Sequence, residues 1–288
     1  MSGSFRSSGL SLIIVGTVGI LLSSCVKNEE GPYVIPDVVY GHKDGMALTF
    51  DVFKPEGRAN GAGILYMVSG GWVSRWSPPD RARNSFENLL SKGFTVFAVR
   101  HGSSPKYKVP DAVEDVRRAV RYIRLHSKEL GVEAERLGVY GGSAGGHLSL
   151  MLGVASDEGY SEAEDEVLKM SNRVAAVVAY YPPVDLRGIA GPNERFPALE
   201  FDSALAPEIS PILFVSSDDS PSLMIHGDED DLVPLSSSQV IYEAFREHGV
   251  ETEMIILKGA GHGFRGEHLN NARSAMVAWF EKYLFENR

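Results

Sequence analysis

Val139-Tyr140-Gly141-Gly142-Ser143-Ala144-Gly145-Gly146 is the stretch that decides the fold, because it contains a G-x-S-x-G pattern centred on Ser143. The residues on either side predict a short buried strand over 136–140 and a helix over 144–154. A serine on such a sharp strand-to-helix turn adopts a strained backbone conformation that holds its hydroxyl out of the sheet. A glycine-rich turn whose serine only caps the helix is the alternative, so the rest of the chain must separate the two.

Composition places the chain among ordinary globular proteins. It has 288 residues, of which 43% are hydrophobic and 23% are charged. Its formal net charge is −10, which argues against binding to the phosphate backbone of nucleic acids. The chain contains one cysteine, so an internal disulfide is excluded.

That cysteine, Cys25, ends a segment with the three-part layout of a secretory signal. One arginine precedes an apolar run over residues 10–22, and Leu22-Ser23-Ser24-Cys25 resembles a bacterial lipobox. We therefore expect a lipoprotein signal peptide over residues 1–24 and lipidation at Cys25. A tether over residues 25–36 would follow, on an exported protein held at the membrane of a bacterial cell envelope. A plain signal peptide and an uncleaved anchor are the alternatives.

The remainder, residues 37–288, is predicted to form one α/β domain. A hairpin comes first, over residues 37–53, and apolar strands then alternate with helices. This alternation predicts a mostly parallel sheet with helices on both faces, and a small cover segment over residues 185–219. The expected strands are 64–68, 94–99, 137–140, 174–181, 222–226 and 253–257, and the expected helices are 84–92, 110–130, 144–154, 236–248 and 271–285.

Ser143, Asp230 and His262 each follow a predicted strand directly. Because the carboxyl ends of parallel strands meet at one edge of a sheet, these side chains are expected to lie together. A serine hydroxyl needs a base to remove its proton, and the base needs an acid that fixes its tautomer. We therefore predict Ser143 as the nucleophile, His262 as the base and Asp230 as its acid partner.

A developing oxyanion requires N–H donors beside the nucleophile. The N–H of Ala144 follows the serine at a helix N-terminus, and Gly70 and Gly71 follow another central strand. We expect these three N–H groups to form the oxyanion site.

Other residues compete for the same roles. The competing bases are His226 and His147, and the competing acids are Asp228 and Asp231. No His, Asp and Glu cluster has metal-ligand spacing, so neither a metal nor an organic cofactor is expected.

Four stretches, 111–116, 141–147, 226–234 and 259–264, carry a resemblance to a known family. From about Tyr40 onward the chain resembles α/β-hydrolase esterases, in particular the bacterial acetyl-xylan/feruloyl-esterase-like (BD-FAE) group, with kinship to hormone-sensitive-lipase-like esterases. The resemblance implies an α/β-hydrolase fold. It also assigns the acid to Asp230, the fifth residue of a His-Gly-x-x-Asp turn, and the base to His262.

One motif departs from the family. The oxyanion loop there usually reads His-Gly-Gly-x-Trp, whereas this chain has Val68-Ser69-Gly70-Gly71-Trp72. The histidine and the first glycine are thus replaced, which leaves open how the loop is braced.

The resemblance implies a serine carboxylesterase for short acyl esters. Acetyl or feruloyl groups on polysaccharide are the expected substrate, and pocket walls are expected from residues 72–76 and 185–219. A serine exopeptidase of the prolyl-oligopeptidase type and a catalytically silent binding module on the same fold are the alternatives.

Overall fold

The computed structural model describes residues 1–3 and 33–285. Most of the predicted signal peptide, the lipidation site Cys25 and most of the tether therefore lie outside the described residues. Among the described residues, no helix combines the length and the apolar character that a membrane crossing needs.

Eight strands form a single sheet in the order β1-β2-β4-β3-β5-β6-β7-β8. The strands from β4 through β3 to β8 are parallel, and the β1–β2 hairpin adds two antiparallel strands at one edge. The strands are β1 Val34–Lys43, β2 Met46–Phe53, β3 Gly63–Met67, β4 Thr95–Val99, β5 Leu137–Gly142, β6 Ala176–Tyr180, β7 Ser222–Gly227 and β8 Thr252–Leu257. The predicted mostly parallel sheet is confirmed.

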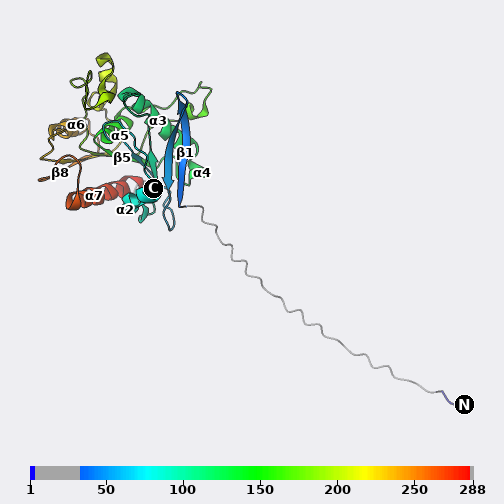
Figure 1. Ribbon diagram of the computed structural model, residues 1–288. Coiled ribbons are helices and arrows are strands. Elements are labelled where there is room, and N and C mark those ends of the chain that lie inside the picture. Colours follow the sequence, from blue (N-terminus) through cyan, green and yellow to red (C-terminus); the bar gives the residue numbers. More distant parts are fainter. Residues whose placement is uncertain (4–32, 286–288) are drawn as a thin grey trace. The chain divides into compact units, whose positions relative to one another are not determined.

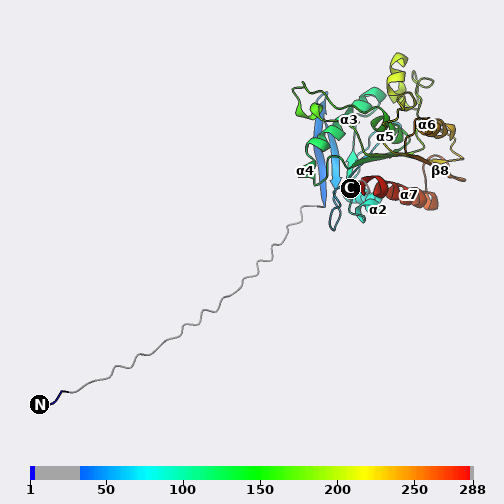
Figure 2. The same cartoon turned by 180° about the vertical axis from the view of Figure 1, so that it is seen from behind.

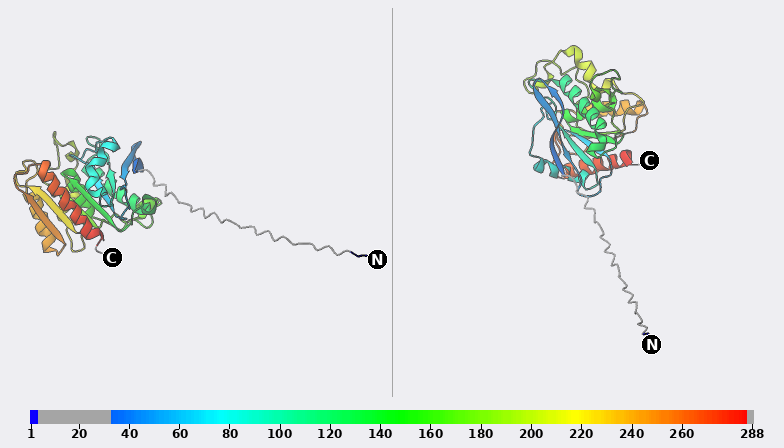
Figure 3. Two further views of the ribbon diagram at one scale, coloured as in Figure 1. Left: turned by 90° about the horizontal axis from the view of Figure 1, so that it is seen from below. Right: turned by 90° about the vertical axis from the view of Figure 1, so that its right-hand side faces the viewer.

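Helices cover both faces of this sheet. Figures 1 and 2 show α3, α5 and α6 on one side and α2 and α7 on the other, and Figure 3 shows α7 lying along the strands. The α-helices are α1 Pro79–Arg83, α2 Glu87–Leu90, α3 Val109–Leu125, α4 Ser127–Leu130, α5 Ala144–Val154, α6 Ser236–Glu247 and α7 Gly266–Phe285. Short 3-10 turns complete the chain: η1 Asn84–Phe86, η2 Glu166–Lys169, η3 Pro197–Leu199, η4 Ser203–Ile209 and η5 Pro211–Leu213.

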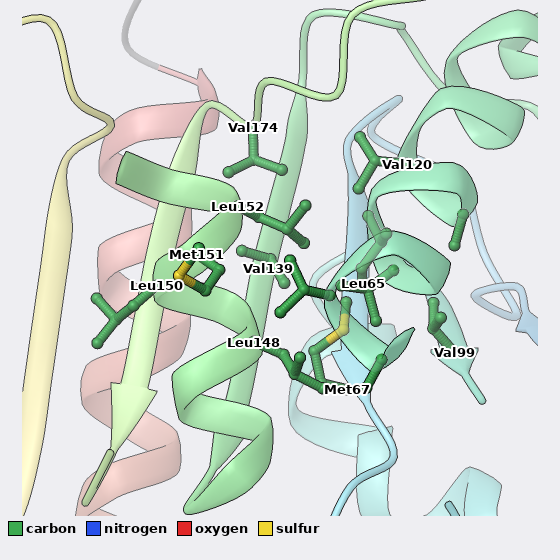
Figure 4. Close-up of a cluster of buried hydrophobic side chains, with 14 of the residues drawn as sticks. Leu65, Met67, Val99, Val120, Val139, Leu148, Leu150, Met151, Leu152 and Val174 are labelled. Atoms are coloured by element: carbon green, nitrogen blue, oxygen red, sulfur yellow. The ribbon is translucent and has the colours of Figure 1, made fainter. Parts of the chain in front are cut away.

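Helix α5 is buried along its whole length, from Ala144 to Val154. Its sequence is apolar or small on every side, as expected of a helix that no face exposes to water. Figure 4 shows Leu148 and Leu152 of this helix beside Met67 and Val139 of the sheet. Burial on all sides fixes the position of the helix N-terminus, and with it the turn that precedes it.

Two predictions about the first strand and the longest helix were wrong. The first strand begins at Val34, so the predicted tether overlaps the sheet by three residues, where Val34 and Ile35 pair with Phe53 and Val52 of β2. The predicted helix 110–130 is interrupted at His126, where φ is −101° and ψ is 18°. The apolar spacing continues across this break to buried Leu130, so periodicity could not reveal it.

The other differences concern the helices α1, α2 and α7 and the segment over residues 185–219. The predicted helix 84–92 is a succession of α1, η1 and α2, because the backbone at Phe86 turns out of helical geometry with φ −105° and ψ 1°. Helix α7 begins at Gly266, five residues before the predicted start, because Leu269 is the one apolar residue of its first five and gives too weak a periodicity to predict a helix. The segment predicted to cover the site, residues 185–219, consists of loops and the turns η3 to η5.

Candidate active site

Ser143 lies on the turn between β5 and α5 with φ 56° and ψ −120°. A non-glycine residue rarely adopts a positive φ, and such strain at a turn is typical of functional positions. The turn is held on both sides, because Ser143 N–H donates to the Tyr180 carbonyl at 2.9 Å and its own carbonyl accepts from His147 N–H at 2.9 Å. The side chain is thereby presented at the carboxyl end of the sheet.

The positions two residues before and after Ser143 have no space for a side chain. A Cβ on Gly141 would lie 2.5 Å from the Gly145 carbonyl carbon, and one on Gly145 would lie 2.9 Å from the Met67 carbonyl oxygen. Backbone atoms cannot give way as a flexible side chain can, so both positions exclude any larger residue. The G-x-S-x-G spacing is therefore a packing requirement of the turn. The Ser143 side chain makes no capping hydrogen bond to α5, which argues against the alternative of a simple cap.

Asp230 and His262 come from the turns after β7 and β8 and meet at a distance of 2.8 Å between Oδ2 and Nδ1. The Asp230 side chain is fully buried, whereas that of His262 is 18% exposed. A carboxylate on Nδ1 places the proton there and leaves Nε2 as the acceptor. This is the tautomer that a base needs to take a proton from serine.

Asp230 is held as a carboxylate by its surroundings. Its Oδ1 accepts hydrogen bonds from Leu232 N–H and Val233 N–H, both at 2.9 Å. Burial by itself raises the pKa of Asp230, but the hydrogen bonds from Val233, His262 and Leu232 outweigh it and hold the pKa below its ordinary value. The group is therefore ionised at neutral pH and able to stabilise an imidazolium.

The competing histidines have structural partners. His226 is fully buried, with Nδ1 2.7 Å from Ser238 Oγ and Nε2 2.9 Å from the Val233 carbonyl. His147 is also fully buried, where Nδ1 accepts from Trp72 Nε1 at 3.3 Å and Nε2 lies 2.8 Å from the Ile209 carbonyl. Burial lowers the pKa of His147 to about 4. Both rings therefore brace the site and remain neutral.

The competing acids lie elsewhere on the same turn. Asp228 is exposed and accepts from Gly259 N–H at 2.7 Å, and Asp231 is exposed. The turns of β7 and β8 also touch through their backbones. Glu229 N–H donates to the Ala260 carbonyl at 3.0 Å, and a Cβ on Gly227 would overlap that same carbonyl oxygen. Asp228 thus ties the two turns together, while Asp230 reaches His262.

The predicted oxyanion loop is a tight two-residue turn. Gly70 and Val73 exchange both backbone hydrogen bonds at 3.1 Å, and Gly71 and Trp72 between them have φ values of 57° and 56°. The Gly70 N–H is therefore engaged with Val73, so its predicted role as an oxyanion donor was wrong. Within the described part of the chain, Gly71 N–H has no acceptor and remains available.

The predicted helix donor, Ala144 N–H, is one of the first N–H groups of α5, which lack partners within the helix. It also lies at the positive end of the α5 dipole, which favours an adjacent negative charge. Of the three predicted oxyanion donors, Gly71 N–H and Ala144 N–H are thus the two that have no other acceptor among the described residues.

A histidine from the neighbouring strand braces the loop. His101, directly after β4, is buried, with Nδ1 2.7 Å from the Gly102 carbonyl and Nε2 2.8 Å from Ser69 Oγ. Nδ1 therefore carries the proton and Nε2 accepts from the Ser69 hydroxyl. Ser74 adds a second link, because its hydroxyl donates to the Val68 carbonyl and accepts from His101 N–H. This chain lacks the histidine of the family's oxyanion motif, and the hydrogen bond between Ser69 and His101 supports the loop in its place.

Ser69→Ala is expected to lower kcat for an ester about tenfold, with KM unchanged. The variant removes one hydrogen bond worth about 1–1.5 kcal/mol, and about 1.4 kcal/mol of lost transition-state stabilisation is a factor of ten. The measurement is steady-state kinetics of wild type, Ser69→Ala, His101→Leu and the double variant. A second substitution should add little to the first, because both break the same contact. Fully additive losses would reject the brace.

A cavity of about 670 Å³ opens beside Ser143 and His262. The predicted walls contribute to it through Arg75 and Phe196, but Trp72 is buried against His147 and does not line it. Part of the remaining wall comes from helices that were predicted as helices but not as walls of the cavity. These residues lie on α1 to α2 and on α7, among them Phe86, Leu89, Leu269, Arg273 and Met276.

Four tyrosines, Tyr66, Tyr140, Tyr180 and Tyr181, also line the cavity and were not singled out from the sequence. Tyr181 packs against His262 with 4.6 Å between ring centroids. All four tyrosines lie within predicted strands. Their position on the strand that leads to Ser143, or on strands close to it, was the one sequence signal that could have placed them in the site. Across residues 33–285, no group of three or more His, Cys, Asp or Glu side chains is arranged to hold a metal ion.

Comparisons with known proteins agree with this geometry. Residues 50–245 match the model of a family described as BD-FAE. The probable carboxylic ester hydrolase LipM of Mycobacterium tuberculosis is 27% identical over 263 residues, which cover 84% of this chain and 58% of LipM. The chain thus spans about three fifths of that curated relative.

Two solved structures extend the comparison. The acetyl ester-xyloside bifunctional hydrolase from Caldicellulosiruptor lactoaceticus has a TM-score of 0.73 at 25% identity, covering 85% of this chain and 95% of its own. A butyrate-bound thermophilic esterase from Thermogutta terrifontis has a TM-score of 0.73 at 25% identity, covering 90% and 98%. The α/β-hydrolase fold of these proteins is the fold of this chain.

Proposed function

The chain belongs to the BD-FAE family, and on that premise we propose that it is a serine carboxylesterase acting through Ser143, His262 and Asp230. The observation that carries the proposal is the 2.8 Å contact between Asp230 and His262. His262 lines the same cavity as Ser143, whose backbone has a strained positive φ. A buried carboxylate that fixes a partly exposed imidazole beside such a serine is the arrangement that acyl transfer requires.

The chemistry follows from these positions. Ser143 Oγ attacks the ester carbonyl while His262 Nε2 takes the hydroxyl proton. The N–H groups of Gly71 and Ala144 stabilise the oxyanion, and the Asp230 carboxylate stabilises the imidazolium. His262 then returns the proton to the leaving alcohol, which gives an acyl-enzyme and a free alcohol. Water repeats the sequence on the acyl-enzyme and releases the acid.

Short acyl groups are the proposed substrates, with acetyl or feruloyl esters of polysaccharide as the natural class. The support is the family, together with relatives described as an acetyl ester-xyloside hydrolase and a butyrate-bound esterase. The tyrosine-rich lining of the cavity also suits a hydroxyl-bearing sugar or an aromatic acyl group.

A p-nitrophenyl ester series from acetate to decanoate tests the proposal, with Ser143→Ala as the inactive reference. We expect hydrolysis by wild type that falls with acyl length. Dipeptide amides measured in parallel separate this outcome from exopeptidase activity. Hydrolysis of amides without esters would favour the peptidase, and absence of both, together with no labelling by a fluorophosphonate, would favour a silent binding module.

Export and lipid anchoring at Cys25 are part of the same proposal, supported by the signal-like sequence of residues 1–25 alone. Cys25→Ala is expected to move the protein from the membrane fraction to the soluble fraction of the producing bacterium. Fractionation followed by immunoblotting measures this, and an unchanged membrane association would reject the lipid anchor.

A further inference from the structure

Helix α7 presents one stripe of side chains toward the sheet and the cavity. Leu269, Arg273, Met276 and Phe280 are spaced by four, three and four residues, which places them on one face of the helix. The first three line the cavity and Phe280 is fully buried. Arg273 is therefore an arginine at a position where the spacing calls for an apolar residue.

The charge of the cavity is opposite to that of the protein. Three arginines, Arg75, Arg100 and Arg273, line it together with one aspartate, Asp51, in a chain whose formal net charge is −10. A cleft lined by one sign of charge concentrates ligands of the opposite sign. The excess of positive charge in the cavity of an acidic chain therefore points to a ligand that carries negative charge.

Arg100 is neutralised by its neighbours. Its guanidinium contacts both Asp51 oxygens, at 2.6 and 2.9 Å, and Asp37 Oδ1 at 2.8 Å. Among the described residues, no carboxylate lies within 4 Å of the Arg75 or Arg273 guanidinium. Arg75 is exposed, so water solvates it, whereas Arg273 is half-buried on the cavity wall. A half-buried guanidinium without a protein partner is free to pair with an anionic group that enters the cavity.

Hydroxyl donors face the same space. Tyr66 and Tyr140 line the cavity, and neither hydroxyl takes part in a hydrogen bond within the described part of the chain. Burial raises the pKa of both phenols, against the opposing effect of the Arg273 charge. Both therefore stay protonated and can donate a hydrogen bond to an acceptor in the cavity.

We propose that the cavity selects esters that carry a carboxylate, and that Arg273 is the counter-ion for that group, assisted by the Tyr66 and Tyr140 hydroxyls. The planar guanidinium fork matches the two oxygens of a carboxylate, and the phenols add donors of the same polarity. This inference rests on the proposed ester hydrolysis and narrows its substrate class to acidic esters. The carboxylate can belong to the acyl group or to the alcohol.

Two pairs of esters test both sources. Monophenyl adipate against phenyl hexanoate places the charge on the acyl side, and 4-acetoxybenzoate against phenyl acetate places it on the alcohol side. Each pair is measured with wild type, Arg273→Met and Arg273→Lys. Because the ratio of anionic to neutral ester is compared between variants, differences in intrinsic reactivity cancel. Arg246→Met on α6, an exposed arginine outside the cavity, is the matched control.

Arg273→Met is expected to lower kcat/KM for the anionic ester of at least one pair about 10- to 100-fold, mainly through KM. Neutral esters should change less than threefold, Arg273→Lys should recover part of the loss, and Arg246→Met should behave as wild type. The pair that responds identifies the side that carries the carboxylate. Equal losses on neutral and anionic esters, or no loss on either, would overturn the inference. Hydrolysis of the neutral esters in those cases keeps the serine esterase itself intact, whereas its absence in wild type would reject the proposed function.

Discussion

Ser143→Ala is expected to lower kcat for p-nitrophenyl acetate by about 10⁴- to 10⁶-fold, the loss typical when a serine hydrolase loses its nucleophile. Alanine keeps the Cβ, so the positive φ at this position and the close packing of Gly141 against Gly145 are unchanged. What disappears is the single oxygen that forms the acyl-enzyme. The remaining N–H donors of Gly71 and Ala144 can still polarise a carbonyl, which leaves a small residual rate.

The measurement is steady-state hydrolysis combined with thermal unfolding. An unchanged unfolding midpoint shows that the loss comes from chemistry. Ser161→Ala, an exposed serine of the loop after α5, is the matched control and should retain wild-type activity. Retention of more than about one hundredth of the wild-type rate by Ser143→Ala would mean that another group is the nucleophile.

Asp230→Asn is expected to lower kcat by about 10⁴-fold, because it reverses the tautomer of His262. The side-chain oxygen of asparagine would stay on the N–H groups of Leu232 and Val233, which both donate to Oδ1. Its amide NH₂ would then face His262 Nδ1, which lies 2.8 Å from Oδ2 in the native protein. Nδ1 would have to accept, Nε2 would carry the proton, and the ring could no longer take a proton from Ser143.

The matched control is Asp228→Asn, two residues earlier on the same turn. Asp228 is exposed and accepts from Gly259 N–H, a bond that an asparagine oxygen can also accept. Kinetics of the two variants should therefore differ by more than a thousandfold. Comparable losses would mean that the turn as a whole matters and that Asp230 has no distinct role.

Much of this architecture could be predicted from local signals. The predicted helix 144–154 coincides with α5, which follows a glycine-rich turn and has a mostly apolar sequence. The order serine, aspartate, histidine, each after a predicted parallel strand, placed the three groups at the carboxyl ends of β5, β7 and β8. The contact between Asp230 and His262 agrees with that expectation.

The remaining features depend on contacts between segments far apart in sequence. Ser69 meets His101 across 32 residues, and Gly70 loses its N–H to Val73 through the geometry of one tight turn. Arg273 lies on a helix whose stripe faces partly the core and partly the cavity, and spacing alone cannot distinguish these two surroundings. One part of the cavity wall depends on the packing of α7 beside the broken helix that ends at Leu90.

The contact between the turns of β7 and β8 has a consequence for engineering and for divergence within the family. Ala260 receives Glu229 N–H and leaves no room for a Cβ on Gly227, so neither turn can change length without displacing the other. The contact between Asp230 and His262 is therefore preorganised in the absence of substrate. Changes of selectivity are therefore expected to come from the more variable walls of the cavity, namely residues 185–219 and the cavity-facing residues of α7. Mutant libraries that vary those cavity walls and leave the turns after β7 and β8 unchanged should give new substrate preferences while the catalytic residues stay in place.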